Sequence, residues 1–159
     1  MIDQDGGLRR GRALADGLSP ADAACVHREA LRVLRPDLDS AHVDAYCDRR
    51  TWPAEALSSY GGALTLAREA VAAGTRSRRA DPGMGIDIDV RDDAQFGLLL
   101  DLVPYTIHAE GRRAGRTVFT ADDSGAALWI AVTRAQEAEL LKRLAARGIA
   151  ATALSARGR

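Results

Sequence analysis

The side chains in this sequence that could act on a substrate or hold a metal ion are chiefly carboxylates, and they fall in two clusters. The first lies in IDIDVRDD, residues 86–93, and the second in FTADDSG, residues 119–125. Carboxylates at the end of one strand and in a neighbouring hairpin can hold two Mg²⁺ ions about 4 Å apart for phosphoryl transfer. The candidate ligands are Asp87, Asp89, Asp122 and Asp123.

These acidic residues and their strand order loosely resemble the palm of polymerases and diguanylate cyclases. The glycine-rich acidic hairpin of the cyclases is missing, however, and no basic phosphate-binding motif accompanies the carboxylates. A structural role explains these carboxylates with fewer assumptions than a metal site does. DDSG supplies the residue types of a tight turn, and Asp92 and Asp93 suit a helix start. Asp87 and Asp89 alternate with isoleucines, as on a strand with one buried face. We therefore expect turns and helix caps, with no metal site, and keep a metal-dependent phosphotransfer enzyme as an alternative.

Histidine and cysteine offer a second kind of chemistry. Cys25 and His27 would point about 200° apart on a helix, and His42 and Cys47 would also diverge, so neither pair has the spacing of a zinc site. His108 could act as a general base but has no partner nearby in the sequence, so we expect it on the surface or on a sheet face. Nucleophile elbows, P-loops and dinucleotide fingerprints are absent. The sequence therefore favours a non-catalytic protein without a cofactor.

Charge gives little support for a polyanionic partner. The chain has 22 basic and 22 acidic residues and a formal net charge of zero. Such a chain lacks the overall positive field of a nucleic-acid or membrane binder. A nucleic-acid-binding protein using the hairpin arginines Arg112, Arg113 and Arg116 stays a second alternative, because a basic loop can contact phosphates.

Composition is that of a globular protein, with 47% hydrophobic and 28% charged residues. No run approaches the roughly 18 apolar residues that a membrane span needs, and the first residues contain no apolar segment typical of a secretory signal. Two cysteines are too few for a disulfide framework. We expect a cytoplasmic protein, and the excess of arginine over lysine together with abundant alanine indicates a bacterial source.

The sequence pattern of the N-terminal half predicts helices. After a flexible lead-in over residues 1–18, Ser19 and Pro20 mark a helix start, and apolar residues then follow at three- and four-residue spacing. The expected helical segment spans 19–74 and contains three helices, the second at about 40–50 and the third from about Pro53.

Past a linker at 75–83 the pattern changes to strands and helices. Residues 84–154 predict the order β-α-β-β-(β)-α-β, which is close to a ferredoxin-like sheet domain, and 155–159 form a tail. The helix from Thr133 carries a capping box with Gln136. The fold class expected is α+β, with an N-terminal three-helix segment followed by this ferredoxin-like domain.

An apolar strand suggests a function. In AALWIAV, Trp129 alternates with Leu128 and Ile130, so both strand faces are apolar and something should cover the second one. We therefore expect a protein–protein interaction or regulatory module that acts through an apolar sheet face or the N-terminal helices, with a protein partner or a second copy of the chain. The predicted interaction face consists of Trp129, Phe119 and Tyr105.

Overall fold

The computed structural model describes residues 7–45 and 51–156 and has an α+β fold. The strands are β1 (Arg10–Leu14), β2 (Ser40–Asp44), β3 (Ile86–Ile88), β4 (His108–Arg113), β5 (Arg116–Asp122), β6 (Ala127–Val132) and β7 (Leu154–Ala156). The helices are α1 (Pro20–Leu34), α2 (Ala54–Ala72), α3 (Asp93–Leu102) and α4 (Arg134–Ala146), with short 3₁₀ turns η1 (Arg35–Asp37), η2 (Asp123–Gly125) and η3 (Ala151–Ala153). Within this part of the chain, no helix combines the length and the apolar character needed to cross a membrane.

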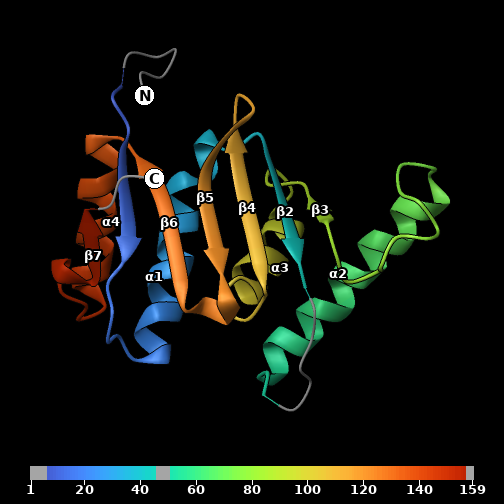
Figure 1. Ribbon diagram of the computed structural model, residues 1–159, viewed down its shortest axis with the longest axis horizontal. Coiled ribbons are helices and arrows are strands. Elements are labelled where there is room, and N and C mark those ends of the chain that lie inside the picture. The colour runs from blue at the N-terminus through green and yellow to red at the C-terminus, as the bar shows by residue number, and fades with distance from the viewer. Residues whose placement is uncertain (1–6, 46–50, 157–159) are drawn as a thin grey trace.

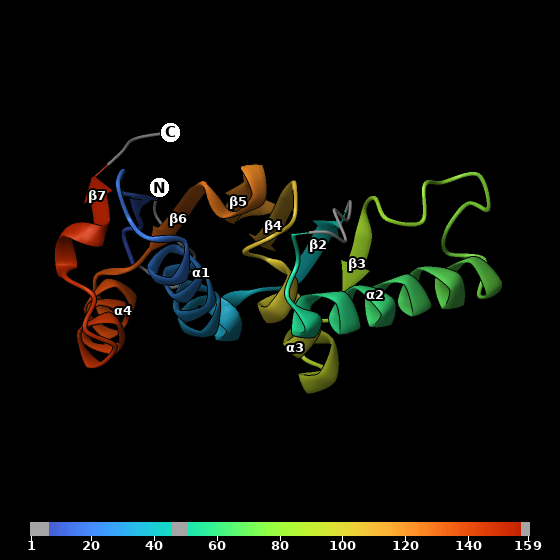
Figure 2. The same ribbon diagram turned by 90° about the horizontal axis from the view of Figure 1, so that it is seen from below.

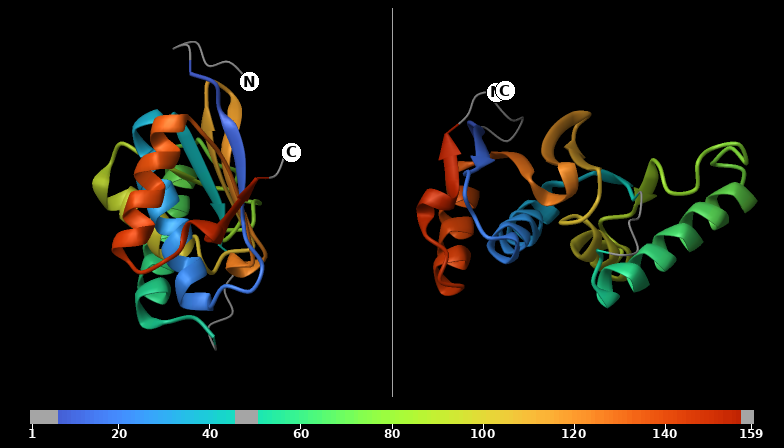
Figure 3. Two further views of the ribbon diagram at one scale, coloured as in Figure 1. Left: turned by 90° about the vertical axis from the view of Figure 1, so that its left-hand side faces the viewer. Right: turned by 60° about the horizontal axis from the view of Figure 1, so that its bottom comes forward.

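The seven strands form one antiparallel sheet in the order β3-β2-β4-β5-β6-β1-β7 (Figure 1). All four helices lie on the same side of this sheet, as Figure 2 and Figure 3 show. The core fills the space between the sheet and the helices. Its buried side chains include Phe119 and Ile130 of the sheet, Leu140 and Leu144 of α4, and Val26 of α1. One face of the sheet is therefore buried against the helices, and the other carries polar side chains together with Trp129.

Helix starts follow the capping signals of the sequence. The Ser19 hydroxyl accepts a hydrogen bond from the backbone N–H of Asp22 at 3.1 Å, and the Asp92 carboxylate accepts one from the N–H of Gln95 at 2.9 Å. The capping box predicted at the start of α4 is present. The roles expected for these polar residues as helix caps are confirmed.

Two predictions in the N-terminal half are wrong. The helix expected at about 40–50 is a strand over Ser40–Asp44, and residues 46–50 of it lie outside the described part of the chain. Ala41 and Val43 are buried at a spacing of two residues, which is the period of a strand. The expected lead-in over 1–18 also contains β1, which pairs with both β6 and β7. The N-terminal half thus supplies two strands to the same sheet.

The ferredoxin-like topology predicted for 84–154 is not confirmed, although its order of strands and helices is. β2 lies between β3 and β4, so β3 is an edge strand that pairs only with β2. Every strand pair is antiparallel, whereas a β-α-β unit joins parallel strands. Insertion of a strand from the N-terminal half is the physical reason for the difference.

The register places a row of side chains on the side of the sheet away from the helices, which we call the open face. His42 lies opposite Glu110, Glu110 opposite Thr120, and Thr120 opposite Trp129. Directly opposed residues of antiparallel strands point to the same side. The open face is defined by His42, His108, Glu110, Thr120, Asp122 and Trp129.

The turn after β5 has an unusual backbone. Asp123, Ser124 and Gly125 have φ values of 53°, 56° and 87°, all in the left-handed region that favours glycine. The N–H groups of Asp123 and Ser124 donate to the carbonyls of Ile107 and Thr106 at 3.1 and 3.0 Å. These bonds fasten the turn to the segment before β4, and so fix where β4 and β5 meet.

We expect Gly125→Ala to destabilise the protein by about 2–4 kcal/mol in urea unfolding, because the added Cβ would overlap the carbonyl oxygen of Pro104 and the backbone conformation is strained for alanine. Gly97→Ala is the matched control, since Gly97 lies in α3 and an added Cβ meets no neighbour within 4 Å. Helix propensity predicts that this control raises stability slightly. Equal stability of both variants would contradict the role assigned to the turn.

Candidate metal centre

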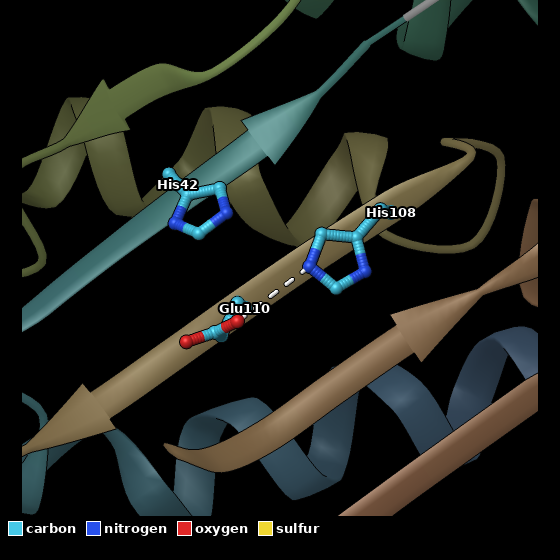
Figure 4. Close-up of side chains that lie close together, drawn as sticks. All are labelled: His42, His108 and Glu110. Carbon is cyan, nitrogen blue, oxygen red and sulfur yellow. Dashed lines mark ion pairs between the residues drawn. The ribbon is translucent and has the colours of Figure 1, made fainter. Parts of the chain in front are cut away.

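Three potential metal ligands lie together on the open face (Figure 4). His108 and Glu110 are two residues apart on β4 and therefore point to the same side, while His42 on β2 is directly opposite Glu110. The nearest ligand atoms of the three side chains all lie within 4.8 Å of one another. Sheet pairing thus joins one residue from the N-terminal half to two from the C-terminal half.

His108 is oriented by a carboxylate. Its Nδ1 lies 2.6 Å from Oδ1 of Asp122, the residue opposite it on β5, and its Nε2 lies 3.7 Å from Oε2 of Glu110. A proton on Nδ1, donated to Asp122, leaves the Nε2 lone pair directed toward Glu110 and His42. Histidines that bind metals commonly have this arrangement, in which the carboxylate fixes the tautomer and makes the imidazole a better ligand.

Glu110 divides its two oxygens between different partners. Oε1 accepts hydrogen bonds from Nε of Arg112 and, at 2.9 Å, from the hydroxyl of Thr117, while Oε2 faces His108. Burial of the side chain, which is 12% exposed, would raise the pKa of Glu110, but the hydrogen bonds from Arg112 and Thr117 outweigh it and hold the pKa below its usual range. Glu110 is therefore a charged carboxylate with one oxygen directed at the two imidazoles.

Two imidazoles and one carboxylate form a recognised ligand set. It is found in catalytic zinc sites and in non-haem iron sites, where three protein ligands leave positions open for water or substrate. Tetrahedral ligands with bonds of about 2.1 Å lie about 3.4 Å apart. The ligand atoms of His42, His108 and Glu110 lie within 4.8 Å of one another, so the widest separation would have to close by up to about 1.4 Å through side-chain rotation when an ion binds.

The four aspartates of the sequence analysis do not gather around a common point. Asp122 belongs to the site as the partner of His108. Asp87 is opposite His42 on β3, and three strand spacings, about 14 Å, separate it from β5. Asp89 accepts a hydrogen bond from the N–H of Arg91 at 2.9 Å, and Asp123 forms the left-handed turn. The turn role predicted for Asp123 agrees with this position, whereas Asp89, which was expected on a strand, lies after the end of β3 at Ile88.

Among the residues that the structure describes, the other histidine and cysteine side chains do not join the cluster. His27 is fully buried in α1, with Nδ1 at 2.7 Å from the carbonyl of Ala23 and Nε2 at 3.3 Å from that of Ala127. Burial lowers the pKa of His27, so the neutral ring is the favoured form. Cys25 is half-buried on the same helix, and Cys47 lies outside the described residues.

The residues predicted as one interaction face do not share a face. Trp129 is half-buried on the open face, opposite Thr120. Phe119 is opposite Ile130 and is buried against the helices, because successive strand residues alternate sides. Tyr105 precedes β4 and packs its ring 6.1 Å from that of Trp52. Only Trp129 is left as a candidate contact on the open face.

The hairpin arginines proposed for phosphate contact are partly neutralised. Arg112 pairs with Glu110, and Nη1 of Arg113 lies 3.0 Å from Oδ1 of Asp37. Arg116 is exposed at the start of β5. Two of the three positive charges are therefore countered within the protein, which weakens the electrostatic case for nucleic acid.

Sequence reasoning could have found two of the three ligands of this site. His108 and Glu110 are two residues apart in a predicted strand, and that spacing alone places them on one face. His42 was missed because its segment was predicted to be helical. Comparisons of the chain with protein-family models, with curated proteins and with solved structures find no match. The geometry of the site therefore carries the functional argument.

The lowered pKa of Glu110 predicts how stability depends on pH in metal-free protein. The charged form is stabilised by folding, so its contribution is complete above the ordinary glutamate pKa, about 4.3, and is lost as the pH falls through the lower folded pKa. We expect the stability advantage of the native protein over Glu110→Gln to shrink below about pH 4.5, as measured by urea unfolding. Glu69→Gln, at an exposed position of α2, should show no such trend. A difference that is constant with pH would contradict the assignment.

Proposed function

We propose that this protein binds a divalent transition-metal ion, with zinc the first candidate, through His42, His108 and Glu110. The observation that carries the proposal is the convergence of three ligand atoms within 4.8 Å on one sheet face, with Asp122 holding His108. Three ligands leave at least one coordination position for water or substrate, as in catalytic rather than structural zinc sites.

The ligand types select the class of metal. Imidazole nitrogens favour zinc, copper, iron and nickel, whereas Mg²⁺ and Ca²⁺ prefer carboxylate, carbonyl and water oxygens. Zinc would act on bound water or a carbonyl oxygen as a Lewis acid. The residues of this chain would supply the position of the ion, and Asp122 would set the tautomer of His108.

A purely electrostatic role explains less of the arrangement. A protonated His108 between Glu110 and Asp122 would account for both carboxylate contacts. It would not account for His42, whose ring makes no hydrogen bond with the residues that the structure describes but lies beside His108. An ion bound by His42, His108 and Glu110 would account for the positions of all three side chains.

We expect calorimetric titration to show Zn²⁺ binding at one site. His42→Ala and His108→Ala should each weaken binding at least 100-fold through loss of a ligand, and Asp122→Ala should weaken it 10- to 100-fold through loss of the supporting carboxylate. Asp87→Asn is the matched control, because Asp87 neighbours His42 on the same face but is outside the ligand set. It should leave the affinity within a few-fold of native.

Two results would contradict this proposal. One is the absence of binding at millimolar Zn²⁺ to folded protein. The other is binding that His42→Ala and His108→Ala leave unchanged, which would place the ion elsewhere.

A second candidate function is a protein contact through the open face, which we propose as self-association. It is supported by the position of Trp129 on the face that no helix of the described structure covers (Figure 2). Indole rings at such positions commonly anchor protein interfaces. Because the formal net charge is zero, long-range repulsion between two copies is weak.

We expect the native protein to have the mass of a dimer in light scattering at about 100 μM, and Trp129→Ser to shift it to a monomer because the central anchor is lost. Leu8→Ser, at an exposed apolar position that is not among the residues defining the open face, is the control. A native protein that is monomeric at this concentration, or a Trp129→Ser variant that stays dimeric, would rule out self-association through this face.

A further inference from the structure

We infer that the metal centre takes a small oxyanion, a carboxylate or phosphate group, with one oxygen on the ion and another on Arg112. This inference rests on the proposed metal binding and adds the class of ligand. The chain supplies the second anchor from the same strand as two of the metal ligands, since Arg112 follows Glu110 on β4.

Arg112 is held in place at one edge of its guanidinium group. Nε donates to Oε1 of Glu110, the oxygen that faces away from His108. The side chain is 49% exposed, and its two terminal nitrogens make no hydrogen bond with the residues that the structure describes. Glu110 therefore positions Arg112 beside the ion while the donors best suited to an oxyanion stay available.

Standard bond lengths suit a bridging group. Glu110 would have one oxygen on the metal and the other on Arg112, which places the guanidinium about 5–6 Å from the ion, given bonds of about 2.1 Å and hydrogen bonds of about 2.8 Å. A second carboxylate or phosphate bridges the same two partners with the same span. The external ligand would thus repeat the bridging geometry that Glu110 would adopt with a bound ion.

Charge is distributed unevenly around the site. The divalent ion and Arg112 bring three positive charges against the carboxylates of Glu110 and Asp122, and metal-bound imidazoles are neutral. Asp44 is opposite His108 and Asp87 is beyond His42, so both lie away from Arg112. Asp39 lies near Arg112, and its carboxylate accepts a hydrogen bond from the N–H of Ala114. Asp44 also accepts a hydrogen bond from the N–H of Gly85 at 2.6 Å. The ion and Arg112 would therefore supply the positive charges that an anion meets at this site.

The test uses full-length protein loaded with Co²⁺, whose visible absorption reports changes in coordination. Inorganic phosphate and acetate are titrated separately, and azide serves as an anion that needs only the ion. We expect phosphate, acetate or both to shift the cobalt spectrum. In Arg112→Gln the affinity for the responding oxyanion should fall at least tenfold, while azide binding changes little. Arg116→Gln, at an exposed position of the same hairpin, is the matched control and should behave as the native protein.

Each outcome decides a different claim. A cobalt spectrum that does not respond to phosphate or acetate overturns the inference, as does a response that Arg112→Gln leaves unchanged, and both leave metal binding intact. Failure to bind Co²⁺ at all would remove the proposed function and this inference together. Response to only one of the two anions identifies which oxyanion the site accepts.

Discussion

The candidate site depends on the register between β2 and β4. Ala41 and Val43 point into the core, so His42 between them must point to the open face, where it meets Glu110. A shift of one residue would move His42 into the apolar layer and expose Val43, which the core disfavours. The register is also fixed at the start of β2, where the N–H of Asp39 donates to the carbonyl of Arg112 at 2.8 Å.

Because of this register, the side chains that stabilise the fold and those of the candidate metal centre lie on opposite faces of the sheet. The helices bury one face of the sheet, and that layer contains most of the large apolar side chains. The other face has little part in the core, so polar and ligating residues occupy it without a large penalty. Rigid strands hold such residues more accurately than loops do, which suits a metal centre. Substitutions at the site should therefore change binding much more than folding.

The sequence predicted features that depend on neighbouring residues, and it was less informative about features that depend on contacts between distant parts of the chain. Helix caps at Ser19, Asp92 and Thr133 were predicted correctly because capping involves neighbouring residues. β2 has only five residues, one of them alanine, and its sequence resembled that of a helix. Nothing in the local sequence indicates that β2 inserts between β3 and β4. The pairing of His42 with Glu110 joins distant parts of the chain, so only the sheet topology could reveal the complete ligand set. The proximity of His108 to Glu110, by contrast, was readable from their spacing.

The most direct measurement is X-ray absorption spectroscopy of the protein loaded with one equivalent of Zn²⁺. We expect a first shell of four or five nitrogen and oxygen atoms at about 2.0–2.1 Å, with the outer-shell scattering of two imidazole rings. His42→Ala should lose the contribution of one ring. A shell of six oxygen atoms without imidazole scattering, or one that includes sulfur, would contradict a centre built from His42, His108 and Glu110.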